Sequence, residues 1–540
     1  MESPFAHRFG TNYVPTDEEI DQIKLDLLLL SEELARIDER IRELSEQRAK
    51  IRAYIEPRKA LISHSRRLPM DILEAIFLAC LPTSRNAAMS LREAPLLLCR
   101  VCSAWRAAAL SMPRLWASLH IPVDFIMAKD SRSFAVDQWL NRAAAASMSL
   151  SICDTSGGWV WGLPPDSSPA SDTLLKSLTR SSASWRNIEF MDMNSGTADA
   201  LAAIEPLKRL ESFKITGDSS HLFQFNLLKG PRLRAVTLLS ESDFDLNLAH
   251  TLPVAWRQLT HLTIQAARSG DHPLFLRNMI LLLEKCPLLV SFHVTLANDE
   301  SPFEYGSLSI LMPFLETFVV PPLYALPHWY LSCITHCVSM PRLRHFHVPI
   351  ANLDSQSESF ALASAGTKLP LVEDLSIYLG SLGPQGLLES LRAYPSLTKL
   401  VADAHMWAWA SANWDPGSAT NSCGTARLIE ILTDTLLCPR LQELQVRNSL
   451  NLSQSALDAF LLARVELEVP CRLRLFGIAF QSAWDDAQIP SLTPTEIQFY
   501  TAQGLHVSIA PTPRAKFEAY TPSPWIGLPG DDNIFHNVQL

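Results

Sequence analysis

The chain has 540 residues, of which 47% are hydrophobic and 19% are charged, and it carries a net charge of −10 at pH 7. This composition is typical of a folded protein and excludes a largely disordered chain, while the length predicts several domains or an array of repeats. The mild, dispersed negative charge argues against nucleic-acid binding, and no apolar stretch approaches the roughly 20 residues that span a bilayer.

The start of the chain, MESPFAHRFG, lacks the basic and apolar stretches of a signal peptide. Ten cysteines over this length do not make a disulfide framework. We therefore expect an intracellular protein, cytoplasmic or nuclear, that does not bind a membrane. Residues 1–16 are expected to be disordered.

A long helix is predicted over residues 17–57, with Thr16 and Glu19 as a capping box and Pro57 at its end. Its apolar residues recur at alternating spacings of three and four, which is typical of the a and d seam of a coiled coil. The seam consists of Ile20, Ile23, Leu27, Leu30, Leu34, Ile37, Ile41, Leu44 and Ile51. Arg48 interrupts it at an a position. Its partner is either a neighbouring domain or a second copy of the chain, which would give a homodimer.

Acidic residues precede basic residues by four positions on this helix, and each such pair is expected to add a few tenths of a kcal/mol. The pairs are Glu32–Arg36, Asp38–Arg42 and Glu46–Lys50.

Two stretches after this helix predict a small helical bundle. RRLPMDILEAIFLACL at 66–81 begins with a Leu-Pro pair and places Ile72, Leu73, Ile76 and Phe77 at helical spacing. PLLLCRVCSAWRAAALSMPRLWASLHI at 95–121 adds a second apolar stripe. That stripe consists of Leu98, Val101, Cys102 and Trp105. A length of about 55 residues is marginal for an isolated domain, which favours packing on a partner.

In their order, these residues resemble an F-box. The matching positions are Leu68-Pro69, Ile72-Leu73, Ile76-Phe77, Val101-Cys102, Trp105-Arg106, Pro113 and Leu115-Trp116. The chain is most similar to the F-box-like proteins abundant in mushroom-forming fungi, in which a heptad helix commonly precedes RLPxEIL..IF and a leucine-rich-repeat-like region follows. Asp71 stands where that pattern has glutamate, and PTSRNAAMSLREAP at 82–95 lengthens the loop between the helices.

The resemblance implies an F-box-like domain over residues 62–121 that docks onto the SKP-type adaptor of a cullin-RING ubiquitin ligase and does no chemistry itself. Carried over by motif position, its adaptor-facing or core residues are Leu68, Pro69, Ile72, Leu73, Ile76, Phe77, Val101, Cys102 and Trp105. An exposed apolar stripe of this kind either binds a partner or makes the protein prone to aggregation. The alternative is that these residues only build a bundle packed under the repeats that follow.

One pattern returns, mostly every 23–30 residues, within residues 122–510: a proline or its equivalent, an anchor two residues later, and apolar residues at +3 and +5 from the anchor. The anchors are Trp185, Leu210, Leu233, Leu259, Leu289, Leu315, Leu343, Val372, Leu397 and Leu441. The alternation predicts a short strand with one buried face, and helical stretches such as LRNMILLLEKC at 276–286 and RLIEILTDTLL at 427–437 precede several strands. One such unit cannot bury its own apolar face, so neighbours must stack.

The predicted fold class is therefore α/β: a coiled-coil helix, an α-helical F-box-like bundle, and an irregular leucine-rich-repeat-like solenoid with a parallel sheet on one face. A helix and a strand within residues 492–510 are expected to cap the solenoid. Residues 511–540, rich in proline and glycine, are expected to form a loosely ordered tail.

Strand residues between the buried positions face outward and are candidates for binding a target protein. The strongest are His293, His345 and His347, beside Arg234, Ser376, Gln442 and Gln445. The long step after Leu397 contains Trp407, Trp409 and Trp414, which are further candidates because tryptophan is a strong interface anchor. Ordinary solvation of the strand residues and packing of the tryptophans over a neighbouring repeat stay open as alternatives.

No nucleophile elbow, phosphate-binding glycine loop or His-Glu-x-x-His motif is present in the sequence. Cys99 and Cys102 form a lone C-x-x-C in the bundle, where core packing is expected. One other group of residues has ligands that could bind a metal, but zinc is not expected there, because its two later histidines point to the solvent face of a strand. That group consists of Cys333, His336, Cys337, His345 and His347. No catalytic residue, metal or cofactor is assigned.

The leading hypothesis is a non-enzymatic substrate receptor of an SCF-type cullin-RING ubiquitin ligase, with the adaptor on the F-box-like region and an unknown target protein on the repeats. The runner-up is a scaffold that oligomerises through its coiled coil and binds a partner without ubiquitin transfer. A third hypothesis is an enzyme whose active-site geometry the sequence does not reveal.

Overall fold

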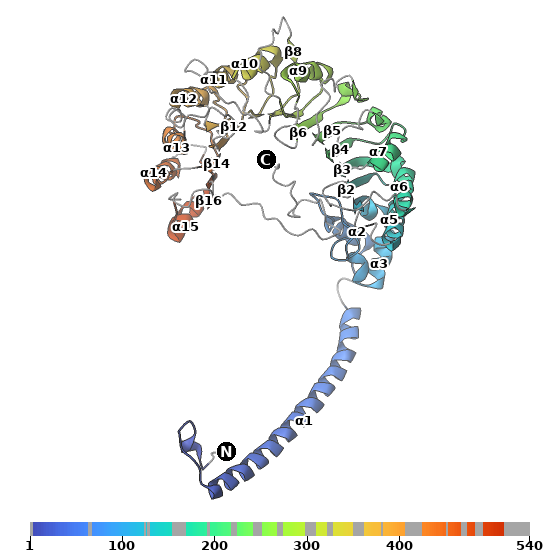
Figure 1. The fold of residues 1–540 in the computed structure, drawn as a ribbon, viewed down its shortest axis with the longest axis vertical. Coiled ribbons are helices and arrows are strands. Elements are labelled where there is room, and N and C mark those ends of the chain that lie inside the picture. Colours follow the sequence, from blue (N-terminus) through green and yellow to red (C-terminus); the bar gives the residue numbers. More distant parts are fainter. Residues whose placement is uncertain are drawn as a thin grey trace. The chain divides into compact units, whose positions relative to one another are not determined.

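The structure is a computed structural model in which the chain falls into two compact units, Met1–Ile76 and Phe77–Leu540. The first unit holds one long helix, and the second holds a large parallel sheet with its helices (Figure 1). The residues that the structure describes are 4–62, 67–123, 126, 130–153, 169–191, 195–217, 224–240, 251–266, 274–296, 309–320, 328–348, 361–379, 382–404, 424–449, 452–465, 472–480 and 490–511.

The segment 1–16, which the sequence predicts to be disordered, contains a short 3-10 helix, η1 (Ala6–Arg8). Arg8 forms an ion pair with Glu19 at 2.6 Å, and Glu19 completes the predicted capping box with Thr16. The Thr16 N–H donates to the Glu19 carboxylate at 2.9 Å, and this hydrogen bond is the main cause that lowers the pKa of Glu19 to about 2. Local polar contacts with the start of the helix therefore order part of this segment.

Helix α1 (Asp17–Leu61) continues four residues beyond Pro57, where the sequence predicts its end. Proline removes one backbone donor from the helical ladder, but the residues after it can still donate. The ladder indeed resumes, since the Ile62 N–H donates to the Arg58 carbonyl at 3.3 Å. The prediction was wrong because one missing hydrogen bond near a helix terminus does not break a helix of this length.

The predicted seam of α1 lies in solvent. From Leu27 onward each seam side chain is 46–60% exposed, and Leu25, Leu28 and Leu29 beside it are 55–58% exposed. No helix among the described ranges combines the length and the apolar character that crossing a membrane requires.

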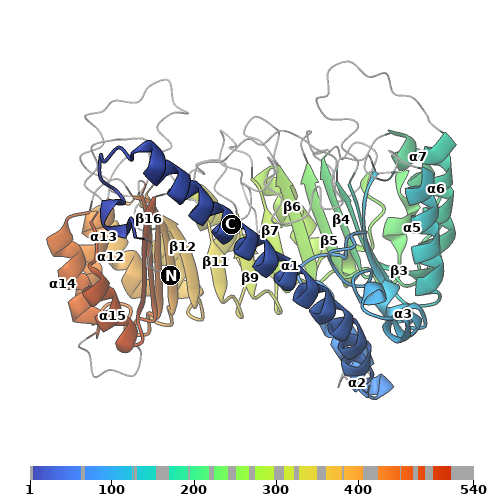
Figure 2. The ribbon, with the colours of Figure 1, turned by 90° about the horizontal axis from the view of Figure 1, so that it is seen from below.

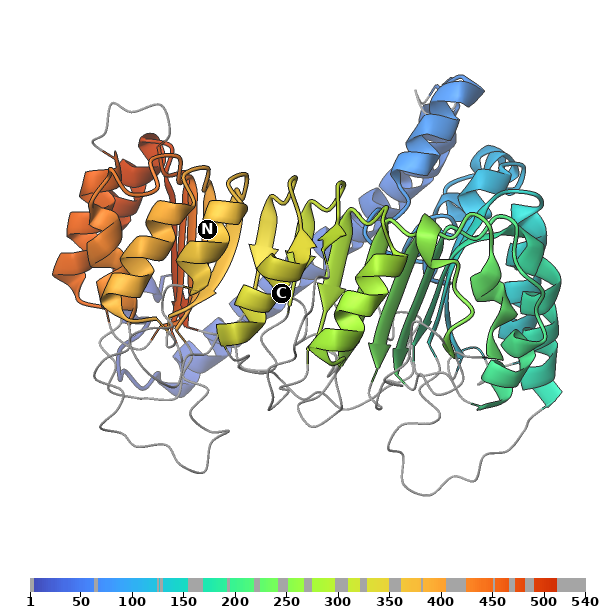
Figure 3. The same ribbon diagram turned by 90° about the horizontal axis from the view of Figure 1, so that it is seen from above.

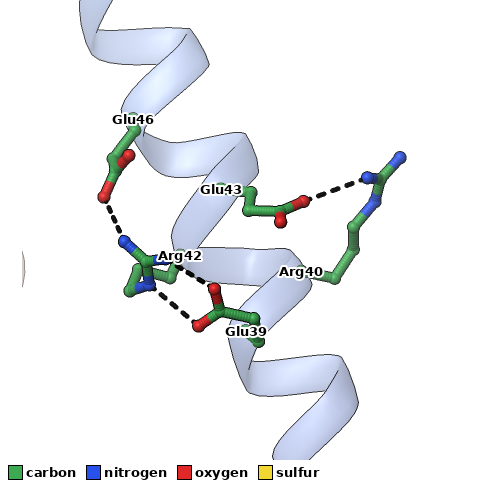
Figure 4. A network of polar contacts seen from close by, with 5 residues as sticks. All are labelled: Glu39, Arg40, Arg42, Glu43 and Glu46. Atoms are coloured by element: carbon green, nitrogen blue, oxygen red, sulfur yellow. Dashed lines mark hydrogen bonds and ion pairs between the residues drawn. The ribbon is translucent and has the colours of Figure 1, made fainter.

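Ion pairs in the middle of α1 are mostly three residues apart, rather than four as expected (Figure 4). Arg42 binds Glu39 and Glu46, each at 2.5 Å, instead of Asp38. Arg40 binds Glu43 at 3.1 Å. These side chains are exposed, so solvent and salt screen each pair and its contribution to stability is small.

Short helices follow α1. They are α2 (Met70–Ala79), η3 (Leu98–Arg100), α3 (Ser103–Leu110) and η4 (Pro113–Trp116). The stripe expected on one helix from Leu98 to Trp105 is divided, because Cys102 is the extended N-cap residue of α3. The boundary between the two units falls inside α2.

Fourteen parallel strands form one sheet in which each strand pairs with its neighbours in chain order (Figures 1 and 2). They are β1 (Ser118–Pro122), β2 (Met148–Cys153), β3 (Trp185–Met191), β4 (Ser212–Gly217), β5 (Ala235–Ser240), β6 (His261–Ala266), β7 (Ser291–Val294), β9 (Thr317–Val319), β11 (His345–His347), β12 (Asp374–Tyr378), β13 (Lys399–Asp403), β14 (Glu443–Ser449), β15 (Leu475–Phe480) and β16 (His506–Pro511). The remaining strands, β8 (Ile310–Leu311) and β10 (Val338–Ser339), pair with each other.

Helices cover one face of this sheet, and none of the described helices of the same unit covers the other face (Figures 1 and 3). They are α5 (Asp130–Ala143), α6 (Pro169–Ser181), α7 (Ser195–Ala202), α9 (Leu276–Lys285), α10 (His328–Cys337), α11 (Ala361–Lys368), α12 (Pro384–Ala393), α13 (Thr425–Thr433), α14 (Gln454–Val465) and α15 (Pro494–Ala502). Short 3-10 helices complete this layer: η5 (Ser182–Ser184), η7 (Asn226–Lys229) and η8 (Trp256–Gln258). The arrangement is a leucine-rich-repeat-like solenoid.

The predicted anchors belong to the hydrophobic core, since all ten, from Trp185 to Leu441, are at most 1% exposed. The apolar residues three positions after the anchors are paired in register from strand to strand, so their side chains form one continuous row across the sheet. That row is Leu119, Leu150, Ile188, Phe213, Val236, Leu262, Phe292, Phe318, Phe346, Leu375, Leu400, Leu444 and Phe476. Every member is at most 1% exposed, so each repeat buries its apolar side only by stacking on its neighbours.

The sheet begins at Ser118, inside the segment 62–121 that the sequence assigns to the F-box-like domain. The loop 82–95 also contributes to it, because the His120 N–H donates to the Ala87 carbonyl at 2.8 Å and Ala88 makes a parallel bridge with His120. Arg85 and Glu93 close this loop with an ion pair at 2.7 Å. The lengthened loop thus covers the free edge of β1, which would otherwise expose unpaired backbone groups.

The predicted cap at the end of the solenoid is present. Helix α15 begins with a capping box between Thr493 and Glu496, and β16 pairs in parallel with β15. The tail 511–540 lies outside the described residues beyond Pro511.

Candidate interaction surfaces

Helix α2 divides its apolar side chains between two faces. Leu73 and Phe77, four residues apart, are buried, with exposed fractions of 8% and 0%. Ile72 and Ile76, also four apart, are 45% and 36% exposed, and Met70 is 57% exposed. The two pairs lie on different faces of the helix because a turn has 3.6 residues. One pair therefore holds the helix in place, and the other leaves an apolar stripe in solvent.

The second stretch of the motif is built around Trp105 on α3. Its ring lies 4.9 Å from the ring of Phe77, and the Cys102 Sγ accepts a hydrogen bond from its backbone N–H at 3.4 Å. Trp105 and Cys102 are half-buried. By contrast, Val101 is 55% exposed and Leu97 is 44% exposed. This stretch thus also presents apolar side chains to solvent beside a packed aromatic pair.

The nine predicted adaptor-binding residues therefore separate into three sets. Leu73 and Phe77 are buried, and Leu68, Cys102 and Trp105 are half-buried. Pro69, Ile72, Ile76 and Val101 are exposed. The exposed set and its neighbours Met70 and Leu97, which the motif does not include, offer apolar area to a partner without rearrangement.

The face of the sheet opposite the helices carries a group of polar residues at its centre. His345 and His347 lie on β11, two residues apart and on the same face, as the alternation of a strand predicts. Their ring nitrogens meet the carboxylate of Asp374 on β12: His345 Nδ1 at 3.4 Å and His347 Nε2 at 3.2 Å. Lys399 Nζ on β13 approaches the same carboxylate at 3.6 Å. Three strands thus supply one charged network.

Opposing effects set the ionisation of this group. Burial raises the pKa of Asp374, which is 9% exposed, but the hydrogen bond from His347 and the nearby Lys399 outweigh burial and lower the pKa below its usual value. Burial is the main cause that lowers the pKa of His293 on β7, and the positive charges that His347 and His261 can carry lower it further. The carboxylate is therefore ionised and His293 is neutral at pH 7.

The sequence correctly places His293, His345 and His347, the histidines predicted to bind a target, on the outward side of their strands, as the alternating burial of β7 and β11 indicates. Of the other outward residues, Ser376 and Gln445 lie on β12 and β14 and are half-buried. Arg234 and Gln442 lie just before their strands, and Arg234 donates to the Gln258 carbonyl at 2.9 Å. Trp407, Trp409 and Trp414 lie outside the described residues.

Asp374 and Lys399 were not singled out from the sequence. Both occupy the position two residues after an anchor, as His345 does, so the repeat spacing itself marks them as outward-facing. Their approach to the histidines depends on which strands pair.

Among the cysteines in the described residues, Cys80 is exposed and the others are buried or half-buried. Cys333 and Cys337 are buried in α10, and burial raises the pKa of the Cys337 thiol. Burial likewise raises the pKa of Cys99. Among the described residues, no three His, Cys, Asp or Glu side chains converge as a metal site requires.

No family model and no curated protein matches the chain. A chain in the crystal structure of the Rad7 and Elc1 complex in yeast is similar, with a TM-score of 0.36 and 14% identity over 64% of this chain and 90% of that chain. A chain in the crystal structure of the TLR13–ssRNA13 complex is similar with a TM-score of 0.28 and 14% identity, over 64% of this chain and 47% of that chain. Both TM-scores are below 0.5, so the function is argued from the residues of this chain.

Proposed function

We propose that the protein is a substrate receptor of an SCF-type cullin-RING ubiquitin ligase. Its F-box-like region, residues 62–121, would bind the SKP-type adaptor, and its solenoid would bind a target protein. The chain would then catalyse nothing itself, because ubiquitin transfer takes place on other subunits. The proposal places it in the cytoplasm or the nucleus, where such ligases work.

The observation that carries this proposal is the exposed stripe on α2. Ile72 and Ile76 are 45% and 36% exposed within a motif that resembles an F-box, while Leu73 and Phe77 anchor the same helix. Burying a large apolar side chain contributes about 1.5–3 kcal/mol, so a helix that leaves such side chains in water is stabilised when a partner covers them. A bundle built only for internal packing would not need this second apolar face.

The solenoid suits the other half of the role. A parallel sheet with helices on one side leaves a broad strand face, on which repeat proteins commonly bind their ligands. At the centre of that face, His345, Asp374 and Lys399 lie side by side in one register row, and Ser376 follows His347 in the next row. Mixed polar side chains of this kind suit recognition of a protein surface.

A pull-down of the full chain with a purified SKP-type adaptor tests the proposal. Ile72→Asp places a charge in the stripe and should weaken adaptor binding at least tenfold, which corresponds to about 1.4 kcal/mol. The matched control is Leu462→Asp on α14, because Leu462 is 46% exposed and lies far along the chain from the motif. A Leu68→Ala, Pro69→Ala double variant tests the loop before α2. The proposal fails if the wild type does not retain the adaptor, or if Ile72→Asp and Leu462→Asp bind it equally well.

The alternative is a scaffold that oligomerises through α1 and recruits a partner without ubiquitin transfer. The exposed seam from Leu27 to Ile51 favours this scaffold, since an apolar heptad pattern that continues for more than three heptads is typical of coiled coils. The seam and the F-box-like region are compatible, so a dimeric receptor is also consistent with this proposal. Light scattering after size-exclusion chromatography decides the point, because a monomer at micromolar concentration excludes the oligomeric scaffold.

A further inference from the structure

Four histidines lie on the helix-free face of the central strands. They are His261 on β6, His293 on β7, and His345 and His347 on β11, and together they are called the histidine band. Register aligns His293 and His347 in one row, with Val319 of β9 between them. A second row aligns Ser291, Thr317 and His345. The band therefore crosses the strands rather than following one of them.

Charged residues continue these rows on the next strands. Asp374, Lys399 and Glu443 follow His345 in register on β12, β13 and β14. Lys399 lies 3.6 Å from Asp374 and 4.0 Å from Glu443. The facing residues of β9, Thr317 and Val319, carry no charge.

Other groups beside the band are already paired. The Thr260 hydroxyl lies 2.9 Å from His261 Nδ1. At the edge where β11 and β12 begin, Arg344 and Glu373 form an ion pair at 3.1 Å. On the β6 side, the nearest ion pair on the same face joins Lys214 of β4 to Glu189 of β3 at 2.5 Å.

Protonation reverses the charge of this surface. With neutral histidines, Lys399, Asp374 and Glu443 give a net charge of −1, and Asp403 and Arg447, which pair in register further along β13 and β14, carry opposite charges that leave this value unchanged. Protonation of all four histidines turns the net charge to +3. The ordinary pKa of histidine, about 6.5, lies between pH 5 and 8. Burial lowers the pKa of His293, so this residue is protonated at a lower pH than an ordinary histidine.

Asp374 also fixes the way in which the histidines can bind a ligand. An ionised carboxylate only accepts hydrogen bonds, so His345 Nδ1 and His347 Nε2 carry the hydrogens that point to it. The other ring nitrogen of each histidine is an acceptor when the ring is neutral and a donor when it is protonated. Proton uptake therefore converts the free side of both rings into donors for an anionic partner.

We propose that the histidine band is a proton-gated binding surface for an acidic peptide segment of a partner protein. This inference rests on the proposed function, in which that partner is the target. From His261 on β6 to Lys399 on β13, the histidine band and the charged residues that continue it span five strand spacings, or roughly 24 Å. A single phosphate or carboxylate ion is much smaller, whereas about seven residues of extended chain cover this distance. The size of the charged band thus favours a peptide.

The thermodynamic linkage between proton binding and peptide binding determines how strongly the affinity for the peptide depends on pH. An acidic ligand raises the pKa of each histidine that it contacts, so binding takes up protons from solution. Each proton taken up changes the affinity tenfold per pH unit. An average uptake of one proton between pH 7.5 and pH 6.0 therefore strengthens binding about 30-fold, and about two thirds of a proton is enough for a tenfold effect.

The experiment uses the full chain and a fluorescein-labelled deca-glutamate peptide, with fluorescence anisotropy at pH 6.0 and pH 7.5 and fixed ionic strength. Glutamate, with an ordinary pKa of about 4.3, stays ionised at both values. We expect the Kd to be at least tenfold lower at pH 6.0. In a His293→Gln, His347→Gln double variant the ratio should fall below threefold, whereas His506→Gln, at an exposed histidine on β16 outside the band, should keep it.

The inference is overturned if wild-type protein binds the peptide equally at both pH values or does not bind it at pH 6.0. It is also overturned if His506→Gln abolishes the pH dependence as fully as the double variant, or if deca-lysine binds more tightly at pH 6.0. If a variant misfolds, the ratio of the wild-type Kd values at the two pH values still tests the inference. An adaptor pull-down on the same samples separates the two proposals, because loss of peptide binding with adaptor retained refutes only the proton gate.

Discussion

Truncating Phe318 tests the buried row on which the stacking of the repeats depends. Phe318 on β9 is fully buried, and its ring lies 5.8 Å from that of Phe292 and 6.0 Å from that of Phe346. Removing a buried phenylalanine side chain costs about 3–5 kcal/mol, of which each aromatic neighbour contributes about 0.5–1.5 kcal/mol. Phe318→Ala should therefore remove much of the stability of the central repeats.

Native-state hydrogen exchange of the full chain measures this effect locally. In a solenoid each repeat contacts only its neighbours, so amides of β7, β9 and β11 should exchange about 100- to 4,000-fold faster while those of β1 and β16 change much less. Phe314→Ala is the matched control, since Phe314 belongs to the same repeat, is 41% exposed and should cost below about 1 kcal/mol. Equal effects of the two variants, or a uniform loss of protection along the sheet, would refute the nearest-neighbour account.

Three further substitutions or measurements probe other parts of the fold. Gly366→Ala would place a Cβ 2.6 Å from a side chain of α12 and should lower the midpoint of thermal unfolding by several degrees, whereas Gly383→Ala meets nothing within 4 Å and should not. Arg464, 5% exposed, donates to two buried carbonyls at 2.9 and 3.1 Å, so Arg464→Ala should cost about 1–3 kcal/mol in chemical denaturation, and an unchanged midpoint would contradict this role. Burial raises the pKa of Cys286 to about 12, so at pH 8 a thiol reagent should label the exposed Cys80 and spare Cys286 until the protein unfolds. The raised pKa also means that Cys286 favours the folded state below pH 9 and that this contribution is lost as the pH rises toward 12.

Much of the solenoid could be predicted because its signal is periodic. A proline, an anchor and two alternating apolar residues recur often enough to locate the strands of the large sheet from β3 to β14, and every anchor is buried, whereas β1, β2 and β15 had no predicted anchor. Where one local signal stood alone, prediction was less successful. Pro57 did not end α1, and the helix predicted over 427–437 ends at Thr433.

The two candidate surfaces needed information that spacing does not contain. Helical spacing separates Ile72 and Ile76 from Leu73 and Phe77, but only the packing of Phe77 on Trp105 shows which pair faces inward. The network around Asp374 depends on the pairing of β11 with β12, which the spacing of their anchors, Leu343 and Val372, does not specify. Contacts between outward residues follow from strand register, which a single repeat does not encode.

Hydrogen exchange of the full chain with and without a purified SKP-type adaptor tests the central claim most directly. The proposed function predicts that the adaptor slows exchange in peptides covering residues 67–80 and 95–105, around the exposed Ile72 and Val101. It also predicts that the central strands of the sheet stay unchanged and available to a target. Protection confined to the strand face, or no protection anywhere at saturating adaptor, would contradict the claim.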